Sequence, residues 1–312
     1  MDHKVLAFYY TWYGVPQVCG NWYHWDEGGH SPNDVNEDGY PDLGTTNHPS
    51  YGPYDSNDPH TIRRHLKWSE EAGIDALIAT WWGQGIYHDK VLKIVLNEAV
   101  NSSIKVTVYY EVVPQSGVSG AVDDFKYILK NYGKHSGFFC VDGKPVIFVY
   151  GRAIGQLNLE QWTEVLKQVR AEYDALFIAD TGSMELISLF DGGHTYNPVG
   201  LVVQQADMDA HYRGLVGTCR SANKIACTTV IPGYDDSNIG RKQIHVANRR
   251  GGELYKSLWA KAENSKPDWI LITSFNEWHE GSEIEPSIED GKLYLQLTRK
   301  LACGFKQTCK KN

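Results

Sequence analysis

The sequence of 312 residues lacks the features by which several classes of protein are recognised. No apolar run reaches the roughly 20 residues of a membrane-spanning helix. The first residues, Met-Asp-His-Lys, do not form a secretory signal peptide. No glycine-rich phosphate-binding loop follows the first apolar stretch, which argues against a dinucleotide-binding sheet. We therefore expect no membrane segment in this chain and no cofactor.

Patterns typical of metal and redox centres are missing as well. The six cysteines form no CxxC pair, and the two histidines of an HExxH motif are absent. We therefore predict neither a zinc site nor a thioredoxin-like centre. The even number of cysteines permits disulfides in an oxidising compartment but does not establish them. Cys303 could pair with Cys309, and Cys219 could reach Cys227.

Positive charge is scarce, and aromatic residues are abundant. Lys and Arg number 30 against 38 Asp and Glu, for a net charge of −8, and no basic stripe is visible. Because nucleic-acid binding depends on Lys and Arg contacts to phosphate, we expect no nucleic-acid partner. The 10 Trp and 19 Tyr often stand in polar surroundings, as at 22–25. Sugar rings stack on such aromatics, although aromatics also fill cores.

Strand-like and helix-like segments alternate along the whole chain. The strands are nearly continuous apolar runs, which is typical of parallel strands covered on both faces. Eight such units predict an α/β protein with one (β/α)8 barrel domain, residues 1–312, and a doubly wound open sheet is the alternative. The predicted strands are residues 5–10, 74–80, 104–110, 145–150, 175–179, 193–196, 226–231 and 269–275, the sixth having the weakest pattern. The predicted helices are residues 60–72, 89–100, 123–132, 159–173, a part of 206–223, a segment containing Leu254, Leu258 and Ala262, and residues 292–301.

A long loop, residues 11–59, separates the first strand from the first helix. It has neither helical nor strand periodicity, and a loop of this length inside a compact domain is usually functional. Its His24, His30, Asp26 and Glu27 suggest a metal site, but solvated charges on a flexible loop are the simpler interpretation.

Polar and aromatic side chains directly follow the predicted strands. In a barrel of parallel strands, the residues that follow the strands meet at one mouth, where active sites form. We therefore expect one cleft to be lined by residues that lie far apart in the sequence. They are Tyr10, Trp82, Glu111, Asp180, Tyr196, Tyr234, Glu277 and Glu280.

The last predicted strand ends in a cluster of acids, within residues 268–286. Glycoside cleavage uses two carboxyl groups around an oxocarbenium-like transition state. Glu277 and Glu280 are three residues apart, so one turn can present both to a cleft, and Glu111 is a third candidate. The residues alone do not decide which of the three transfer protons. A solvated acidic loop is the alternative, because structural networks also gather acids.

Three other residues of this stretch have simpler interpretations. Glu283 and Glu285 are expected to be solvated or structural. His279 is a conceivable metal ligand, but no second His or Cys stands at ligand spacing, so we expect it to orient a carboxylate or to contact substrate.

Residues 274–286, S-F-N-E-W-H-E-G-S-E-I-E-P, closely resemble the signature of glycoside hydrolase family 99, the endo-α-mannosidases. The usual form of that signature has Thr where this chain has Ser282. Further blocks follow in the order of the family and span nearly the whole chain. They are T-W-Y-G at 11–14, Y-P-D-L-G at 40–44, S-N-D-P at 56–59, Y-G-K-H at 132–135 and P-G-Y-D-D-S at 232–237.

The resemblance implies a role for individual residues and a reaction. It makes Glu277 and Glu280 the catalytic pair. It implies a retaining, endo-acting cleavage of internal α-1,2-linked mannosides, through a 1,2-anhydro sugar formed by the substrate's own 2-hydroxyl. The substrate-binding residues would be Tyr13, Trp82, Glu111 and Tyr196, with Asn276 and His279 as further candidates.

The partner implied is an oligosaccharide or polysaccharide, an α-mannan or an N-glycan-like molecule, bound by a monomer. The compartment stays open, and the resemblance favours an extracytoplasmic one (secreted, periplasmic or luminal) if a leader has been removed. Two other functions stay open: a barrel hydrolase that acts on a different α-glycan, and a glycan-binding protein without activity. An intact acid pair argues against the second, since binding alone does not need two proton-transfer groups.

Overall fold

The structure, a computed structural model, describes residues 2–308. Its centre is a closed sheet of parallel strands in the order β3-β2-β1-β11-β8-β7-β6-β5. The sheet closes where β3 pairs with β5, with Val108 opposite Ile147. The predicted (β/α)8 barrel is therefore confirmed. Its strands are β1 (Lys4–Tyr9), β2 (Ala76–Trp81), β3 (Lys105–Tyr110), β5 (Lys144–Val149), β6 (Leu176–Asp180), β7 (Gly192–His194), β8 (Ile225–Val230) and β11 (Trp269–Ile272).

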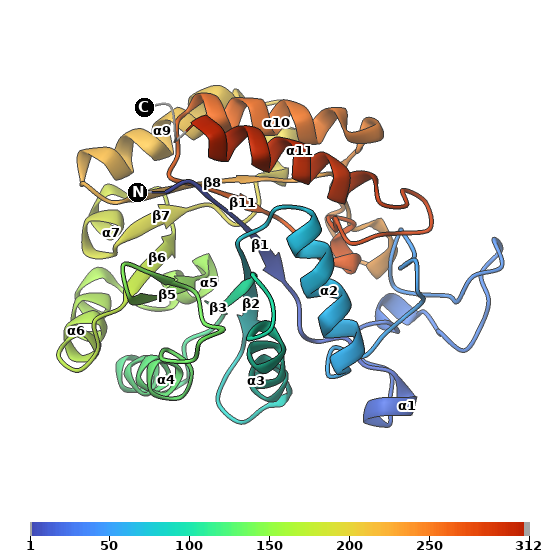
Figure 1. Cartoon of the computed structure of the whole chain (residues 1–312), viewed down its shortest axis with the longest axis horizontal. Coiled ribbons are helices and arrows are strands. Elements are labelled where there is room, and N and C mark those ends of the chain that lie inside the picture. Colours follow the sequence, from blue (N-terminus) through green and yellow to red (C-terminus); the bar gives the residue numbers. More distant parts are fainter. Residues whose placement is uncertain (1, 309–312) are drawn as a thin grey trace.

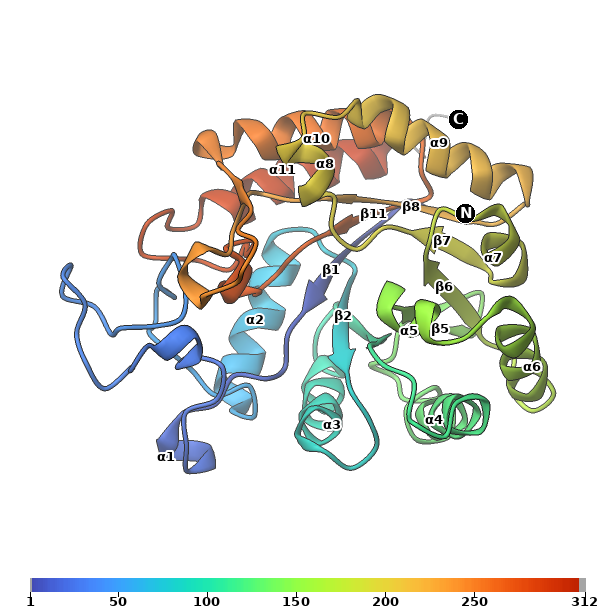
Figure 2. The same ribbon diagram turned by 180° about the vertical axis from the view of Figure 1, so that it is seen from behind.

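A helix follows each strand, and the helices surround the sheet (Figures 1 and 2). The described ends of the chain lie on one side of the barrel, and the long first loop lies on the other (Figure 1). The helices are α2 (Pro59–Glu71), α3 (Tyr87–Ala99), α4 (Val118–Asn131), α6 (Leu159–Arg170), α7 (Met184–Leu189), α9 (Met208–Ser221), α10 (Glu253–Asn264) and α11 (Leu293–Thr308).

The apolar residues of the strands fill two separate layers. Along β1, Val5 and Ala7 pack with the helices, and Leu6 and Phe8 pack inside the barrel. This alternation follows from the two-residue period of a strand. The inner layer is closed by large side chains such as Trp269, which is fully buried. The barrel is therefore filled, and any ligand has to bind at one of its ends.

The sixth strand is weak in the sequence because it is short and consists of small residues. β7 has three residues, whereas residues 193–196 were predicted. A side chain at Gly192 would lie 2.6 Å from the carbonyl oxygen of Ile225 and 2.8 Å from Ile178. Glycine thus permits the close contact of β7 with its neighbours. Because glycine has no side chain, the strand lacks the apolar run that marks the other strands in the sequence.

Several short elements were not predicted. They are too brief to show a periodic pattern. The list comprises α1 (Pro16–Cys19), α5 (Gly151–Gln156), α7, α8 (Val199–Val203), the β4 strand (Cys140–Val141), the pair β9 (Tyr234–Asp235) and β10 (Val246–Ala247), and the 3-10 turns η1 (Glu27–Gly29), η2 (Ser237–Ile239), η3 (Arg250–Gly252) and η4 (Trp278–Glu280).

The possible pair Cys219–Cys227 does not form. Cys219 and Cys227 are both buried, on α9 and β8, and both thiols are free. Cys303 is free as well, and its predicted partner Cys309 lies outside the described residues. Within residues 2–308, no helix combines the length and the apolar character needed to cross a bilayer.

Candidate active site

The two central acids lie on a tight turn that is fastened at its base. β11 ends at Ile272, three residues before the predicted end, because the chain then folds back on itself. The backbone N–H of Ser274 donates to the Ser282 carbonyl (2.8 Å), and the Ser274 hydroxyl accepts from the Glu277 N–H (2.6 Å). Glu277 precedes η4 and Glu280 ends it, so both side chains leave the same closed turn.

Glycine is required where this turn reverses. Gly281 has a φ of 53°, in the left-handed region that disfavours other residues. A side chain there would also lie 2.8 Å from the Thr46 hydroxyl and 3.1 Å from the backbone of Asp235. The position of Glu280 therefore depends on the glycine that follows it.

Tyr13 and Asn276 support the turn from behind. The Asn276 amide accepts from the Tyr10 N–H (2.7 Å) and donates to the Tyr10 carbonyl (2.9 Å), which joins the turn to the end of β1. The Tyr13 hydroxyl accepts from the Trp278 N–H (3.0 Å). Both side chains are fully buried. The structure thus gives them a position behind the wall of the site, whereas both were predicted to bind substrate, Tyr13 from the resemblance and Asn276 from its place beside Glu277.

Glu283 and Glu285 are structural, and the alternative of solvated acids is wrong for both. Glu285 accepts hydrogen bonds from Tyr54 (2.8 Å) and Trp278 (3.0 Å), and its other oxygen lies 3.0 Å from His65. Glu283 pairs with Arg249. Both carboxylates are buried and partnered, as the cost of burying charge requires.

A cavity of about 250 Å³ opens where the barrel strands end. It brings together six of the predicted site residues, from β2 to η4: Trp82, Glu111, Tyr196, Glu277, His279 and Glu280. Of the residues expected only from their place after a strand, Tyr10 also lines it. The remaining wall is formed by Trp12, His24, Glu27, Tyr109, Tyr150, Arg152 and Arg241.

A larger cavity, about 540 Å³, lies at the opposite end of the barrel. Its wall comes from residues that precede strands, among them Lys144, Asp191, Lys224 and Asp268. Active sites of (β/α)8 barrels form at the carboxyl ends of the strands. The smaller cavity with its convergent acids is therefore the candidate active site.

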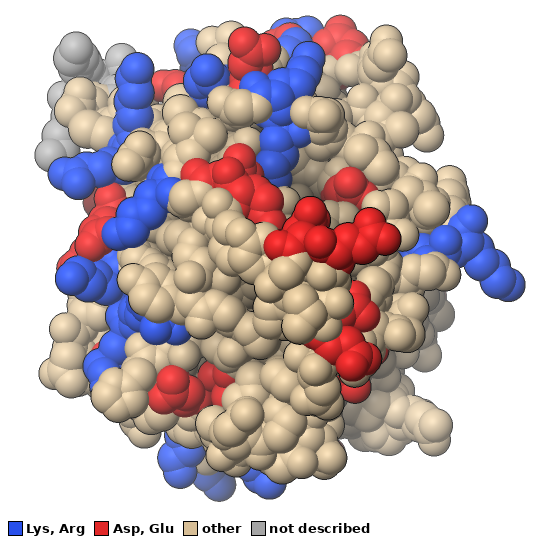
Figure 3. All heavy atoms as spheres, turned by 90° about the vertical axis from the view of Figure 1, so that its right-hand side faces the viewer, with Lys and Arg blue, Asp and Glu red and all other residues tan. Residues whose placement is uncertain are grey.

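The side of the molecule that carries the long first loop is acidic in its middle. Asp and Glu side chains gather there, and Lys and Arg lie mostly towards its edges (Figure 3). Because like charges repel, this face does not suit a polyanion such as nucleic acid.

Glu277 and Glu280 share an electrostatic environment with one cation. Burial raises the pKa of Glu277 well above its ordinary value, and the nearby Glu280 carboxylate raises it further. Burial also raises the pKa of Glu280, against the effect of Arg241, whose guanidinium donates to its carboxylate at 3.0 Å. Two adjacent buried acids disfavour double ionisation. One proton shared by two carboxyl groups is the state that acid–base chemistry needs.

Glu111 lies across the cavity with its own cation. Burial raises its pKa to about 8, although the nearby Arg152 guanidinium acts in the opposite direction. Arg152 also lies over the Trp82 ring, 4.8 Å from its centre. The Trp82 Nε1 is buried and has no hydrogen-bond partner among the described residues. This side of the cavity thus offers an aromatic face, an N–H donor and a carboxyl group.

The raised pKa of Glu111 predicts a dependence of stability on pH. The folded-state pKa exceeds the ordinary value of 4.5, so the unfolded chain releases this proton first as the pH rises. The contribution to stability is complete below about pH 4.5 and is lost as the pH rises through about 8. The difference corresponds to at most ~5 kcal/mol. We expect Glu111→Gln to remove this loss, so that the variant becomes more stable than the wild type near pH 8.

Urea unfolding of both proteins at about pH 5 and about pH 8 measures the difference. Glu37→Gln, an exposed change in the first loop, serves as the control and should follow the wild type. Parallel stability curves for wild type and Glu111→Gln would contradict a protonated Glu111.

Several wall residues were not among the predicted site residues. Arg152 belongs to the short α5 and Arg241 to the segment between β9 and β10, and nothing in the sequence around them marks them. In the first loop, Trp12 stands in the T-W-Y-G block without an assigned role, and Glu27 was considered only for a metal site. The view that no second histidine stands near His279 is wrong in three dimensions, because the first loop brings His24 to it.

A pair of buried carboxyl groups at the mouth of a (β/α)8 barrel, in a cavity lined by aromatics, defines a glycoside hydrolase. Comparison with known proteins specifies which one. Residues 1–298 match the model of glycosyl hydrolase family 99, and the chain belongs to that family.

Individual relatives agree with this assignment over almost the whole chain. A Homo sapiens glycoprotein endo-alpha-1,2-mannosidase-like protein is 30% identical over 96% of this chain and 75% of its own length. The Mus musculus glycoprotein endo-alpha-1,2-mannosidase is 29% identical over 96% of this chain and 74% of its own length. Among solved structures, the family 99 endo-alpha-mannosidase from Bacteroides thetaiotaomicron matches with a TM-score of 0.83 and 28% identity, over 97% of each chain.

Proposed function

We propose that this protein is a retaining endo-α-1,2-mannosidase that cleaves internal linkages of an α-mannan or a mannose-containing oligosaccharide. The observation that carries the proposal is the pair Glu277 and Glu280, presented to one cavity by one closed turn. Family membership and the names of the relatives supply the substrate class. The cavity lies at the mouth of the barrel, where the strands end.

The first half of the proposed reaction closes a ring on the substrate. Glu277, as a carboxylate, takes the proton of the mannosyl 2-hydroxyl, and the oxygen attacks C1 from the face opposite the leaving group. The bond from C1 to the leaving oxygen breaks, and Glu280, as the acid, gives that oxygen its proton. In an α-mannoside the axial 2-hydroxyl is trans to the departing group, so the displacement is stereochemically possible.

The second half opens the 1,2-anhydro sugar with water. Water attacks C1 and gives a proton to Glu280, the bond from C1 to the 2-oxygen breaks, and Glu277 returns its proton to that oxygen. Both acids are then back in their starting states, and C1 has been inverted twice, which retains the α configuration. Arg241 donates to Glu280 in the free protein and favours its ionised form, so the shared proton has to move from Glu277 to Glu280 when substrate binds.

The other wall residues supply binding. The Trp82 ring is suited to stack on a sugar on the non-reducing side, and its free Nε1 to donate to a hydroxyl. Glu111 and Tyr196 approach from β3 and β7, and His279 stands beside Glu277, with its Nδ1 3.5 Å from the carboxylate. Together these groups surround the sugar whose bond is broken.

Incubation with a panel of glycans tests the function. We expect α-1,2-linked mannans or glucosylated mannosides to be cut to oligosaccharides, and α-1,6-linked and β-1,4-linked mannans to stay intact. Mass spectrometry of the products distinguishes internal cleavage from the release of single mannose units. Cleavage of another α-glycan, with the mannosides left intact, would contradict the proposed substrate but not the assignment as a glycoside hydrolase. Binding without any cleavage would overturn the assignment as an enzyme.

A further inference from the structure

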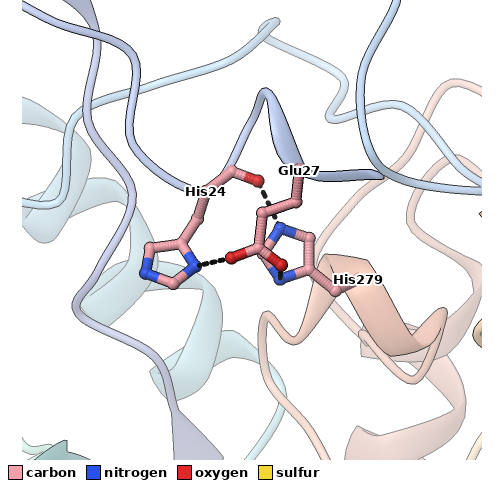
Figure 4. Close-up of side chains that lie close together, drawn as sticks. All are labelled: His24, Glu27 and His279. Atoms are coloured by element: carbon pink, nitrogen blue, oxygen red, sulfur yellow. Dashed lines mark hydrogen bonds and ion pairs between the residues drawn. The ribbon is translucent and has the colours of Figure 1, made fainter. Parts of the chain in front are cut away.

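The first loop and the η4 turn bring a second group of side chains together at the cavity wall. His24 and Glu27 come from the loop and His279 from η4 (Figure 4). Two imidazole nitrogens and a carboxylate oxygen, one from each residue, lie within 4.8 Å of one another. These are donor atoms that suit first-row transition metals, and they lie near enough to one another to be drawn onto one ion.

The orientation of His279 is fixed so that one ring nitrogen is available. Its Nε2 contacts the carbonyl oxygen of His24, so this nitrogen carries the proton and donates it. The Nδ1 atom then carries a lone pair, and it lies 3.8 Å from Glu27 Oε2 and 3.5 Å from Glu277 Oε1. Metal-bound histidines are commonly held in this way, with the other ring N–H donated to a backbone carbonyl.

His24 differs from an ordinary histidine–carboxylate pair in the same loop. His30 forms a hydrogen bond of 2.6 Å with Asp42. The Nδ1 of His24 lies 2.7 Å from Glu27 Oε1, but it is buried and lacks the in-line geometry of a hydrogen bond. His24 has a left-handed backbone, with a φ of 62°. Its carbonyl oxygen meets His279, while its ring nitrogen faces Glu27 (Figure 4).

We propose that His24, Glu27 and His279 form a site for a divalent transition-metal ion of the zinc class, with its open coordination positions directed into the cavity. Hydrolysis does not use the ion. The effect of the ion on catalysis rests on the proposed function. The ion would lie beside Glu277 and hold that side chain as a metal-bound carboxylate. It would therefore inhibit hydrolysis, because Glu277 could no longer take the proton of the 2-hydroxyl. Removal of metal by a chelator therefore leaves activity unchanged or raises it.

Calorimetric titration of metal-stripped protein with ZnCl2 tests the site without any need for activity. We expect His24→Gln and Glu27→Gln each to weaken the binding by at least about 10-fold, since each removes one of three ligands. His30→Gln is the matched control, because it disrupts a histidine–carboxylate pair in the same loop, and it should bind as the wild type does. MgCl2 and CaCl2 should not compete, since these ions prefer oxygen ligands. Bound Co²⁺ should give the visible absorption of a nitrogen- and oxygen-ligated ion in the wild type and in His30→Gln alone.

Equal zinc affinity in the wild type and His24→Gln would overturn the site, because the ion would then lie elsewhere. Should His24→Gln not fold, Glu27→Gln decides, since 43% of the Glu27 side chain is exposed and the change is tolerated. Zinc bound at the site without loss of mannoside hydrolysis would overturn the inhibition. If no α-mannoside is cleaved under any condition, the proposed function fails, and the calorimetry still decides the metal site.

Discussion

Replacement of Glu280 by Gln is expected to leave the protein folded and to slow the hydrolysis of an α-1,2-mannoside by about 10²–10⁴-fold. The amide has the shape of the carboxyl group and can still accept the hydrogen bond from Arg241, but it has no proton to give to the leaving oxygen. Glu277→Gln should lose as much, because an amide cannot take the proton of the 2-hydroxyl. Each loss corresponds to about 3–5 kcal/mol of the activation barrier.

The leaving group separates the two roles. An aryl glycoside of the same oligosaccharide with a strongly acidic phenol departs without a proton. We therefore expect this substrate to restore most of the rate of the first half of the reaction, seen as the release of the phenol in a single turnover, in Glu280→Gln and none of it in Glu277→Gln. Circular dichroism and thermal melts show whether the variants are folded, and Glu289→Gln, at a carboxylate outside the cavity that contacts His48, is the control for activity. Near wild-type rates in a folded Glu277→Gln or Glu280→Gln would contradict the assignment.

The barrel could be predicted because its strands carry a pattern that depends only on burial. Parallel strands covered on both faces read as apolar runs, and the polar residue that ends each run marks the mouth of the barrel. Glu111 and Glu277 were found in this way, and both line the cavity. The sequence pattern of β7 was the weakest of the eight strands. Its glycines are needed because neighbouring strands come close to it, and glycine adds nothing to an apolar pattern.

The rest of the site could not be predicted, because it depends on contacts between loops. Arg241 reaches Glu280 from a segment with no periodicity, and its role follows only from a hydrogen bond across 39 positions of sequence. His24 and His279 are 255 positions apart. Asn276 shows the opposite case, since its place in the signature is visible in the sequence, whereas its hydrogen bonds to the backbone of Tyr10 are not.

A substrate that lacks the 2-hydroxyl at the cleaved mannose is expected to bind and to resist cleavage. In the proposed reaction this oxygen is the nucleophile, and Glu277 acts only on its proton. Without it no 1,2-anhydro ring can form, and the loss should be at least as large as that in Glu277→Gln, about 10²–10⁴-fold or more. If Glu277 attacked C1 directly, the 2-deoxy substrate would keep a nucleophile and would still be cleaved.

The analogue is compared with the parent glycan by calorimetry for binding and by single-turnover kinetics for cleavage. Removal of a different hydroxyl, the 3-hydroxyl of the same sugar, is the matched control, since it takes away one hydrogen-bonding group but leaves the nucleophile. Proton NMR during hydrolysis of the parent should give the α-anomer first, because two inversions at C1 restore the starting configuration. A β-anomer formed first would refute retention. The 2-deoxy substrate could also be hydrolysed rapidly while the parent glycan still gives the α-anomer first. The mechanism would then be retaining, but a group of the protein would attack C1 in place of the 2-hydroxyl, and Glu277 would be the candidate.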